Sequence, residues 1–112
     1  MIVENVKGSN KISEAPPYPY NSWLDYWEKN SGQIFIPKQC PACGRIVTRK
    51  ELDGCHVQKA NNPFDGRWYI VPLCDRCNHS KEKLDVGNIP LVPTQATYNI
   101  VLSSSYLAAI KL

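Results

Sequence analysis

The sequence predicts one small α+β domain, and three observations lead to this fold class. The chain has 112 residues, which is the size of a single domain. Short runs of β-forming residues alternate with two segments of helical character. Two C-x-x-C pairs, Cys40 to Cys43 and Cys74 to Cys77, are separated by 30 residues. A chain this short buries only a modest core, so a cross-link between the two pairs would matter for its stability.

The cysteine pairs predict one tetrahedral Zn²⁺ site. Each C-x-x-C pair supplies two thiolates from a tight turn, and Gly44 frees the backbone to turn under the metal. The alternative is two disulfides in a secreted protein. However, the chain has five cysteines, an odd number, and Met1 to Asn5 lack the basic start and apolar run of a secretory signal. We therefore expect a structural zinc ion with four ligands: Cys40, Cys43, Cys74 and Cys77.

Charge and hydropathy narrow the class of protein further. No apolar run approaches the roughly 20 residues that span a membrane, so we expect a soluble, cytoplasmic protein. The formal net charge is +3, and residues 38–83 hold nine basic and five acidic side chains. This balance favours a polyanionic partner such as DNA or RNA. A merely solvated basic face is the alternative interpretation.

The first third of the chain predicts a strand, a connector and a helix. Ile2 to Val6 has the character of a short strand. Residues 16–19, Pro-Pro-Tyr-Pro, form an extended connector because proline fixes φ and restrains the residue before it. A helix over 22–31 begins at the cap Ser22, has Asp25 as the acid of a capping box, and ends before the next glycine.

Three apolar residues, Trp23, Leu24 and Trp27, share one face of this helix. Large aromatic residues on a short amphipathic helix usually anchor a core. We therefore expect the helix to pack on the metal module, and stacking of the tryptophans on nucleic-acid bases is the alternative.

Residues 38–85 form the expected metal module, in the order knuckle, β-hairpin and helix. Strands are expected at 34–36, 45–50, 55–57 and 68–73. A turn at Asp53-Gly54 and a loop at 61–66 separate the later strands. A helix begins near Asp75 and runs to about Leu84.

The domain is expected to cover residues 1–93, and its last residues, 90–93, are extended. Residues 94–112 form a C-terminal tail. Within this tail we expect a strand at 98–102 and a short helix at 106–112.

The order of knuckle, hairpin and C-x-x-C helix is the treble-clef, or ββα-metal, plan. Residues 40–83 resemble the HNH nuclease family in its four-cysteine branch. The chain looks especially like a group of small bacterial HNH-like proteins with a Gly-x-His-Val strand and a Tyr-Ile-Val-Pro-Leu-Cys strand. The matching motifs are the C-x-x-C-G knuckle, Gly54-Cys55-His56-Val57, Pro72-Leu73-Cys74 and Cys74-x-x-Cys77-Asn78-x-x-Lys81.

The resemblance implies a metal-dependent phosphodiesterase that acts on DNA or RNA. His56 corresponds to the general base that activates water, and imidazole has a suitable pKa for that role. A divalent cation such as Mg²⁺ would stabilise the scissile phosphate, and Asn78 corresponds to its ligand on the helix. Asp53 or Asp65 is an alternative source of a carboxylate ligand, outside the matching motifs. The candidate phosphate contacts are Arg76 and Lys81.

Two residues depart from the pattern of the family. Cys55 stands where the family has a metal-binding Asp, and a soft thiolate is a poor ligand for Mg²⁺. Tyr69 stands where the family has an Asn that orients the base, and we expect this tyrosine to belong to the hairpin core. His79, beside Asn78, is a further candidate ligand.

Two functions therefore stay open. The first is nucleic-acid binding by a zinc-stabilised HNH-like module with a degenerate or atypical metal-dependent phosphodiesterase site. The second is a non-catalytic structural zinc module that binds protein or nucleic acid, in which His56 is hydrogen-bonded inside the hairpin. In a third interpretation, Cys55 beside His56 is a catalytic or redox-sensing thiol. The alternative is that Cys55 is a buried, inert thiol.

Overall fold

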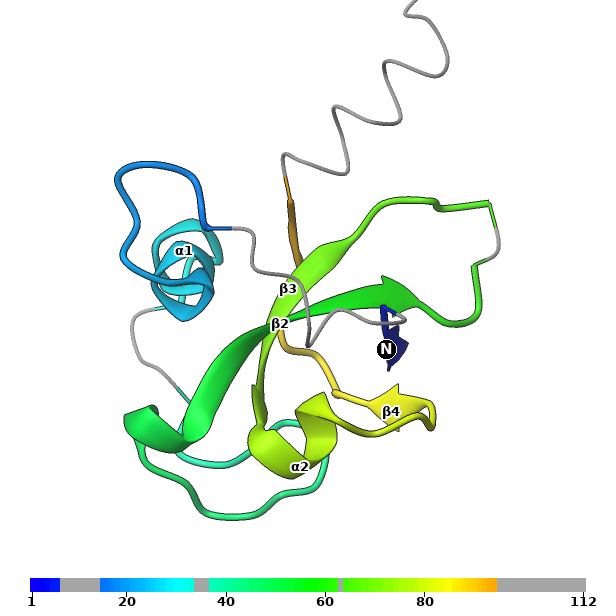
Figure 1. The fold of residues 1–112 in the computed structure, drawn as a ribbon. Coiled ribbons are helices and arrows are strands. Elements are labelled where there is room, and N and C mark those ends of the chain that lie inside the picture. The colour runs from blue at the N-terminus through cyan, green and yellow to red at the C-terminus, as the bar shows by residue number, and fades with distance from the viewer. Residues whose placement is uncertain (7–14, 34–36, 63, 95–112) are drawn as a thin grey trace, which may run out of the picture.

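The computed structural model describes residues 1–6, 15–33, 37–62 and 64–94 (Figure 1). The elements in this part of the chain are β1 (Ile2–Asn5), α1 (Trp23–Asn30), the 3₁₀ turn η2 (Arg49–Glu51), β2 (Leu52–Lys59), β3 (Tyr69–Cys74), α2 (Asp75–Asn78), β4 (Leu84–Asp85) and β5 (Val92–Pro93). The predicted α+β class is confirmed. Among these elements, neither helix has the length and apolar character needed to cross a membrane.

β2 and β3 lie at the centre of a five-stranded antiparallel sheet with the order β4-β1-β2-β3-β5. The β2–β3 hairpin has the longest register, from Leu52 opposite Cys74 to Val57 opposite Tyr69. Its strands are rich in β-branched and aromatic residues, which suit a pleated, buried surface. The hairpin predicted from the sequence is therefore confirmed, and it delivers Cys74 to the start of α2.

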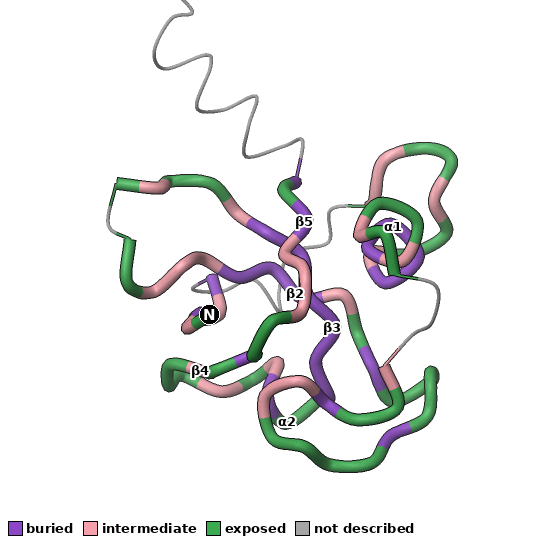
Figure 2. Tube along the Cα trace, turned by 180° about the vertical axis from the view of Figure 1, so that it is seen from behind, coloured by how far each residue is buried: buried purple, intermediate pink, exposed green. Residues whose placement is uncertain are grey.

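Neighbouring side chains on β2 point to opposite faces of the hairpin, because strand side chains alternate. Cys55 and Val57 join a core that also contains three of the cysteines of the two C-x-x-C pairs. His56 points to the other face and contacts Trp23 of α1. On that side Trp27 and Ile70 belong to a second core. In Figure 2 the buried stretches run along β2, β3 and one side of α1.

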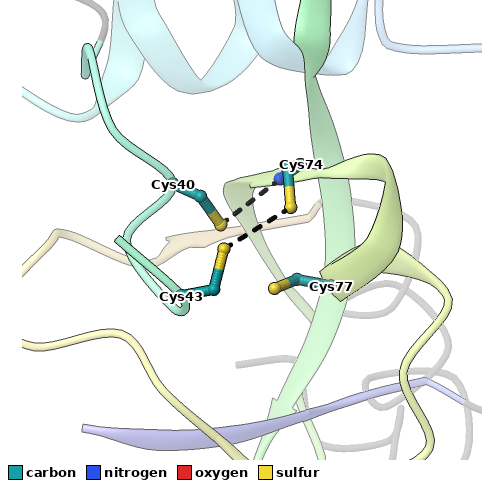
Figure 3. Close-up of side chains that lie close together, drawn as sticks. All are labelled: Cys40, Cys43, Cys74 and Cys77. Carbon is teal, nitrogen blue, oxygen red and sulfur yellow. Dashed lines mark hydrogen bonds between the residues drawn. The ribbon is translucent and has the colours of Figure 1, made fainter. Parts of the chain in front are cut away.

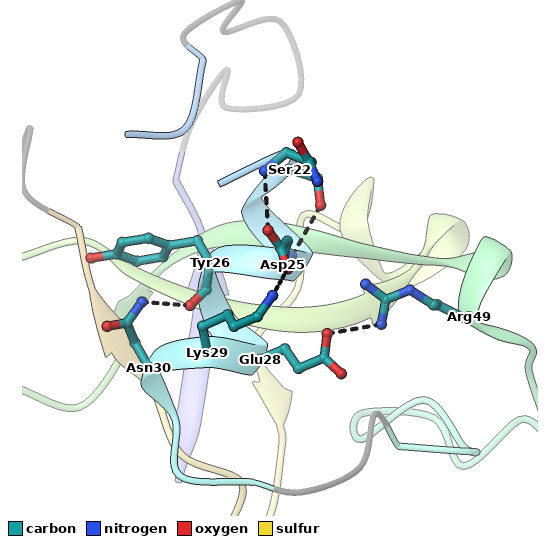
Figure 4. A network of polar contacts seen from close by, with 8 residues as sticks. Ser22, Asp25, Tyr26, Glu28, Lys29, Asn30 and Arg49 are labelled. Atoms are coloured by element: carbon teal, nitrogen blue, oxygen red, sulfur yellow. Dashed lines mark hydrogen bonds and ion pairs between the residues drawn. The ribbon is translucent and has the colours of Figure 1, made fainter. Parts of the chain in front are cut away.

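α1 begins and ends close to its expected bounds. The Ser22 hydroxyl accepts a hydrogen bond from the Asp25 N–H at 3.0 Å, as an N-cap does. The Asp25 carboxylate accepts from the N–H of Asn21 rather than that of Ser22, and it pairs with Lys29 at 2.6 Å (Figure 4). After Asn30 the chain reverses through the glycine at position 32, whose φ is +78°.

Two aromatic side chains of α1 donate hydrogen bonds to carbonyls in residues 90–93. The indole of Trp27 is fully buried and donates to the carbonyl of Pro90 at 2.8 Å. The hydroxyl of Tyr26 donates to the carbonyl of Pro93 at 2.7 Å. The predicted core role of Trp27 is therefore confirmed, and the helix covers the hairpin as expected.

Gly54 lies inside β2 and not in a turn, so the turn predicted at Asp53-Gly54 is wrong. The glycine is required by the close approach of α1. A Cβ on Gly54 would lie 2.4 Å from the carbonyl carbon of Trp23 and 2.5 Å from the backbone nitrogen of Leu24. A glycine inside a strand often marks a place where another backbone approaches closely, and Gly54 is an example.

The helix after Cys74 is much shorter than predicted, because α2 ends at Asn78 rather than near Leu84. Asn5, on β1, donates from its amide to the carbonyls of Cys77 at 2.8 Å and Ser80 at 2.9 Å. These bonds satisfy acceptors that a helix end leaves free. The chain then turns back so that Leu84 pairs with β1.

The strand predicted at 45–50 is also largely absent. This segment contains one isolated bridge, between Gln39 and Ile46, and then passes into η2. A capping box between Thr48 and Glu51 closes that turn. The expected strands at 34–36 and 98–102 and the expected helix at 106–112 lie outside the described residues.

Candidate metal centre

The first cysteine pair lies in a knuckle formed by residues 38–47. The N–H of Gly44 donates to the carbonyl of Cys40 at 2.8 Å, and the N–H of Cys40 donates to the carbonyl of Arg45 at 2.8 Å. Gly44 has a φ of +77°, a backbone conformation that favours glycine. This tight turn directs the thiols of Cys40 and Cys43 toward the same point, as the sequence predicts.

The second pair lies at the junction of β3 and α2. Cys74 ends β3 and is also the N-cap residue of α2, while Cys77 lies within the single turn of that helix. The N–H of Cys74 donates to the sulfur of Cys40 at 3.5 Å, which links the two pairs directly.

The four sulfur atoms form one compact cluster (Figure 3). All of them lie within 4.8 Å of one another, and the Sγ atoms of Cys43 and Cys74 are 3.8 Å apart. Zn–S bonds of about 2.3 Å in a tetrahedron require sulfurs separated by about 3.8 Å. The five cysteines of the chain are free thiols in this structure. The cluster therefore has the dimensions and the donor atoms to hold a metal ion such as zinc.

The thiols of the cluster have unequal electrostatic environments. The N–H of Arg45 and the guanidinium of Arg76 stabilise the Cys43 thiolate, and together they lower the pKa of Cys43 to about 6. Burial raises the pKa of Cys77, and its neighbouring thiols act in the same direction. A dication at the centre would favour the thiolate form of all four residues, since metal binding releases the thiol protons.

His56 lies away from this cluster, on the face of the hairpin that α1 covers. Its side chain is only 7% exposed. The imidazole lies edge-on to the rings of Trp23, at 4.9 Å, and Trp68, at 6.0 Å. Its buried Nε2 atom has no hydrogen-bond partner within the described part of the chain. Burial lowers the pKa of His56, so the ring is held in its neutral form.

Asp53 lies on the opposite side of the hairpin from His56, because the two residues differ by an odd number of positions along β2. Burial raises the pKa of Asp53, the charge of Asp75 adds to this effect, and His79 opposes it. The Nδ1 atom of His79 lies 2.8 Å from the carbonyl of Asp75 and 3.4 Å from its carboxylate. The structure thus brings Asp53 toward α2 and leaves His56 on the other face.

Asn78, the other candidate cation ligand, is the last residue of α2 and is half-buried. The sequence reasoning missed Asp75 as a neighbour of Asp53. The four-residue spacing of Asp75 and His79 predicts that these two side chains meet on a helical turn. That spacing could have drawn attention to Asp75 as a polar residue of this region.

The two residues that depart from the HNH pattern are both buried. The thiol of Cys55 donates to the carbonyl of Asp53 at 3.3 Å, and burial raises its pKa well above the ordinary value. Cys55 is therefore held as a protonated, inaccessible thiol. Tyr69 belongs to the hairpin core, as expected, and its hydroxyl donates to the carboxylate of Asp65 at 2.6 Å.

Several basic residues lie close to the four cysteines in the sequence, and their side chains are exposed. The guanidinium of Arg76 interacts with the sulfur of Cys43, and that contact raises the pKa of Arg76. Within the described residues, no ion pair joins any of five further cations to a carboxylate. These exposed cations are Lys38, Arg45, Lys50, Lys81 and Lys83.

Comparisons with family models, with curated proteins and with solved structures found no match to this chain.

Proposed function

We propose that this chain is a zinc-stabilised module of the treble-clef type that binds nucleic acid and does not cut it. The observation that carries the proposal is a set of exposed cations, on the segments that the cysteine cluster joins, for which the described residues provide no ion-pair partner. Lys38, Arg45 and Lys50 belong to the knuckle and η2, while Lys81 and Lys83 follow α2. Phosphate contacts from such residues supply most of the sequence-independent affinity for nucleic acids.

Zinc is the metal that best suits the cluster in this proposal. Four thiolates in a tetrahedron are typical of a structural zinc site and leave no position open for a substrate. The ion would join the knuckle to the β3–α2 junction and would fix the segments that carry the cations. It would have no chemical role of its own.

The environment of His56 supports a structural role for this residue. A general base must come within hydrogen-bond reach of the water that it activates. The imidazole is instead packed between two tryptophans beneath α1. The non-catalytic alternative is therefore the one that we propose, with one correction: aromatic packing holds the imidazole, and the hydrogen bond expected from the sequence is absent at Nε2 among the described residues.

Binding is tested by fluorescence anisotropy with labelled DNA and RNA oligonucleotides at increasing salt. We expect Lys38→Gln combined with Arg45→Gln to weaken binding severalfold, and each lost phosphate contact to reduce the salt slope by about 0.9. Lys29→Gln combined with Arg67→Gln is the control of equal charge, because it removes two exposed cations away from the knuckle. Absence of binding at low salt, or equal weakening by the control, would contradict the proposal.

Catalysis is tested with supercoiled plasmid and RNA in the presence of Mg²⁺, Mn²⁺ or Ni²⁺. We expect no cleavage with any of these metals. Metal-dependent cleavage that His56→Phe abolishes in a folded protein would establish the phosphodiesterase function instead. In that case Asp53 and Asn78 would be the residues to test next as cation ligands.

A further inference from the structure

The four cysteines of the metal centre differ sharply in their access to solvent. Cys43 is exposed, whereas Cys40, Cys74 and Cys77 are buried, with exposures of 1%, 0% and 5%. An oxidant that diffuses from solvent therefore meets the sulfur of Cys43 first. The susceptibility of a cysteine to oxidation follows this exposure and the thiolate character that metal binding provides.

One close sulfur neighbour of Cys43 belongs to the other pair. The Sγ atoms of Cys43 and Cys74 are 3.8 Å apart and face each other in Figure 3. Cys40 shares the knuckle with Cys43, and the sulfurs of Cys40 and Cys74 each accept one backbone N–H, from Cys74 and from Cys77. The separation of 3.8 Å from the Cys43 sulfur places the Cys74 thiolate to attack an oxidised Cys43.

We propose that Cys43 and Cys74 form a redox-sensitive pair through which hydrogen peroxide opens the metal centre. This inference rests on the proposed zinc occupancy. In the first step the Cys43 thiolate attacks one peroxide oxygen, the O–O bond breaks, and sulfenic acid and hydroxide form. In the second step the Cys74 thiolate attacks the Cys43 sulfur, the S–S bond forms, and a second hydroxide leaves. Two thiolates lose two electrons, and these reduce one peroxide.

The disulfide removes two of the four zinc ligands, one from each side of the centre. Cys40 and Cys77 alone are a poor site for zinc, which needs four donors, so the ion is released. The knuckle and α2 are then joined by a covalent bond in place of the metal. Arg45 and Arg76 form hydrogen bonds with Cys43, so their positions change when the tetrahedral site is lost.

The test treats the zinc-loaded protein with less than one equivalent of hydrogen peroxide. A metallochromic indicator follows zinc release, and tryptic peptides are mapped without reduction. Trypsin leaves Cys40 and Cys43 together on peptide 39–45 and separates Cys74, on 68–76, from Cys77, on 77–81. We expect one zinc ion released for each disulfide formed, and a cross-link between peptides 39–45 and 68–76 through Cys43.

Two variants complete the test. Cys43→His keeps a zinc ligand but removes the thiol, so we expect it to retain zinc and to release it severalfold more slowly. Cys55→Ser alters the one cysteine outside the cluster and should behave as the wild type does. If Cys43→His does not fold, the peptide map of the wild type still decides the matter.

Three outcomes would overturn this inference: an internal Cys40–Cys43 disulfide as the main product, first oxidation at Cys55, or zinc release without any disulfide. The proposed function fails in a different way. If the purified protein contains no zinc, or binds no nucleic acid, the proposed module is refuted before any peroxide is added.

Discussion

Gly54 lies beneath the first turn of α1, where the backbone of the helix touches the sheet. The atoms that a methyl group would meet belong to the backbone of Trp23 and Leu24, which cannot rotate away as a side chain would. The separation between α1 and β2 therefore depends on one missing side chain.

We expect Gly54→Ala to lower the free energy of unfolding by about 1–3 kcal/mol, because α1 must shift to admit the methyl group. Urea denaturation followed by tryptophan fluorescence measures the change. Gly66→Ala is the control, since a Cβ at Gly66 meets no atom within 4 Å. Its effect should stay within about 0.5 kcal/mol. Similar losses for the two variants would contradict the contact described here.

His56 gives the fold a dependence on pH. The folded state lowers the pKa of His56, whereas the unfolded chain binds a proton near the ordinary value of 6.5. Between these two pKa values the unfolded state holds more protons, so stability falls as the pH falls below about 6.5. One histidine contributes at most about 1.4 kcal/mol per pH unit to this loss.

We expect His56→Phe to remove this contribution. Unfolding free energies measured from about pH 5 to pH 8 should show a wild type that loses stability relative to the variant as the pH falls. His79→Gln, at the other histidine of the chain, is the comparison variant, because it leaves the packing of His56 intact. A variant that follows the wild type at every pH would show that His56 is not the group responsible.

The residues of the metal centre were predictable because each C-x-x-C pair is a local feature of a few positions. The environment of His56 was not predictable in the same way. Its strand could be recognised from its neighbours in sequence, but its face depends on where α1 docks. Trp23 lies more than 30 positions upstream of His56, and no local pattern reports that contact.

At the scale of elements, α1 is bound to the sheet by two long-range hydrogen bonds as well as by its buried face. Tyr26 and Trp27 both reach carbonyls in residues 90–93. The Glu28 carboxylate also pairs with Arg49 of η2 at 3.0 Å, although both groups are partly exposed (Figure 4). The helix therefore connects β5 with the segment that follows the knuckle.

We expect Tyr26→Phe to lower the free energy of unfolding by about 0.5–1.5 kcal/mol, because the carbonyl of Pro93 loses its donor. Tyr20→Phe is the matched control. Tyr20 lies edge-on to Tyr26 at 5.1 Å, and its hydroxyl has no hydrogen bond among the described residues. Equal effects in thermal or urea denaturation would show that the hydroxyl bond of Tyr26 contributes nothing.

The bounds of α1 followed from its own residues, whereas those of α2 did not. Ser22 and Gly32 mark the ends of α1 locally. The end of α2 is set by Asn5, which lies 72 positions before Cys77 in the sequence. The residues after Cys74 therefore predict a longer helix, and the hydrogen bonds of a distant side chain end it early.

At the scale of the whole molecule, the cysteine cluster brings the knuckle against the junction of β3 and α2. The knuckle has little regular structure of its own, with one isolated bridge between Gln39 and Ile46. Structural zinc sites contribute about 10–16 kcal/mol of apparent binding energy, which exceeds the stability of most small domains.

We expect a strong chelator to unfold the protein near neutral pH, and added Zn²⁺ to restore it. Metal analysis should find one zinc ion per chain, and near-ultraviolet circular dichroism should follow the loss of packing. Cys40→Ser should mimic chelation, whereas Cys55→Ser should keep the metal. A chain that stays fully folded without metal would refute the structural role of the ion.

The sheet order also determines when this fold can be completed during synthesis. β1 precedes both of its partners along the chain, which are residues 57–59 on one side and residues 84–85 on the other. Nascent β1 therefore has neither of these edges to join until β2 has emerged. The hairpin and the four cysteines of the cluster are complete by residue 77, before β4, so they can form first and present the edge that β1 later fills.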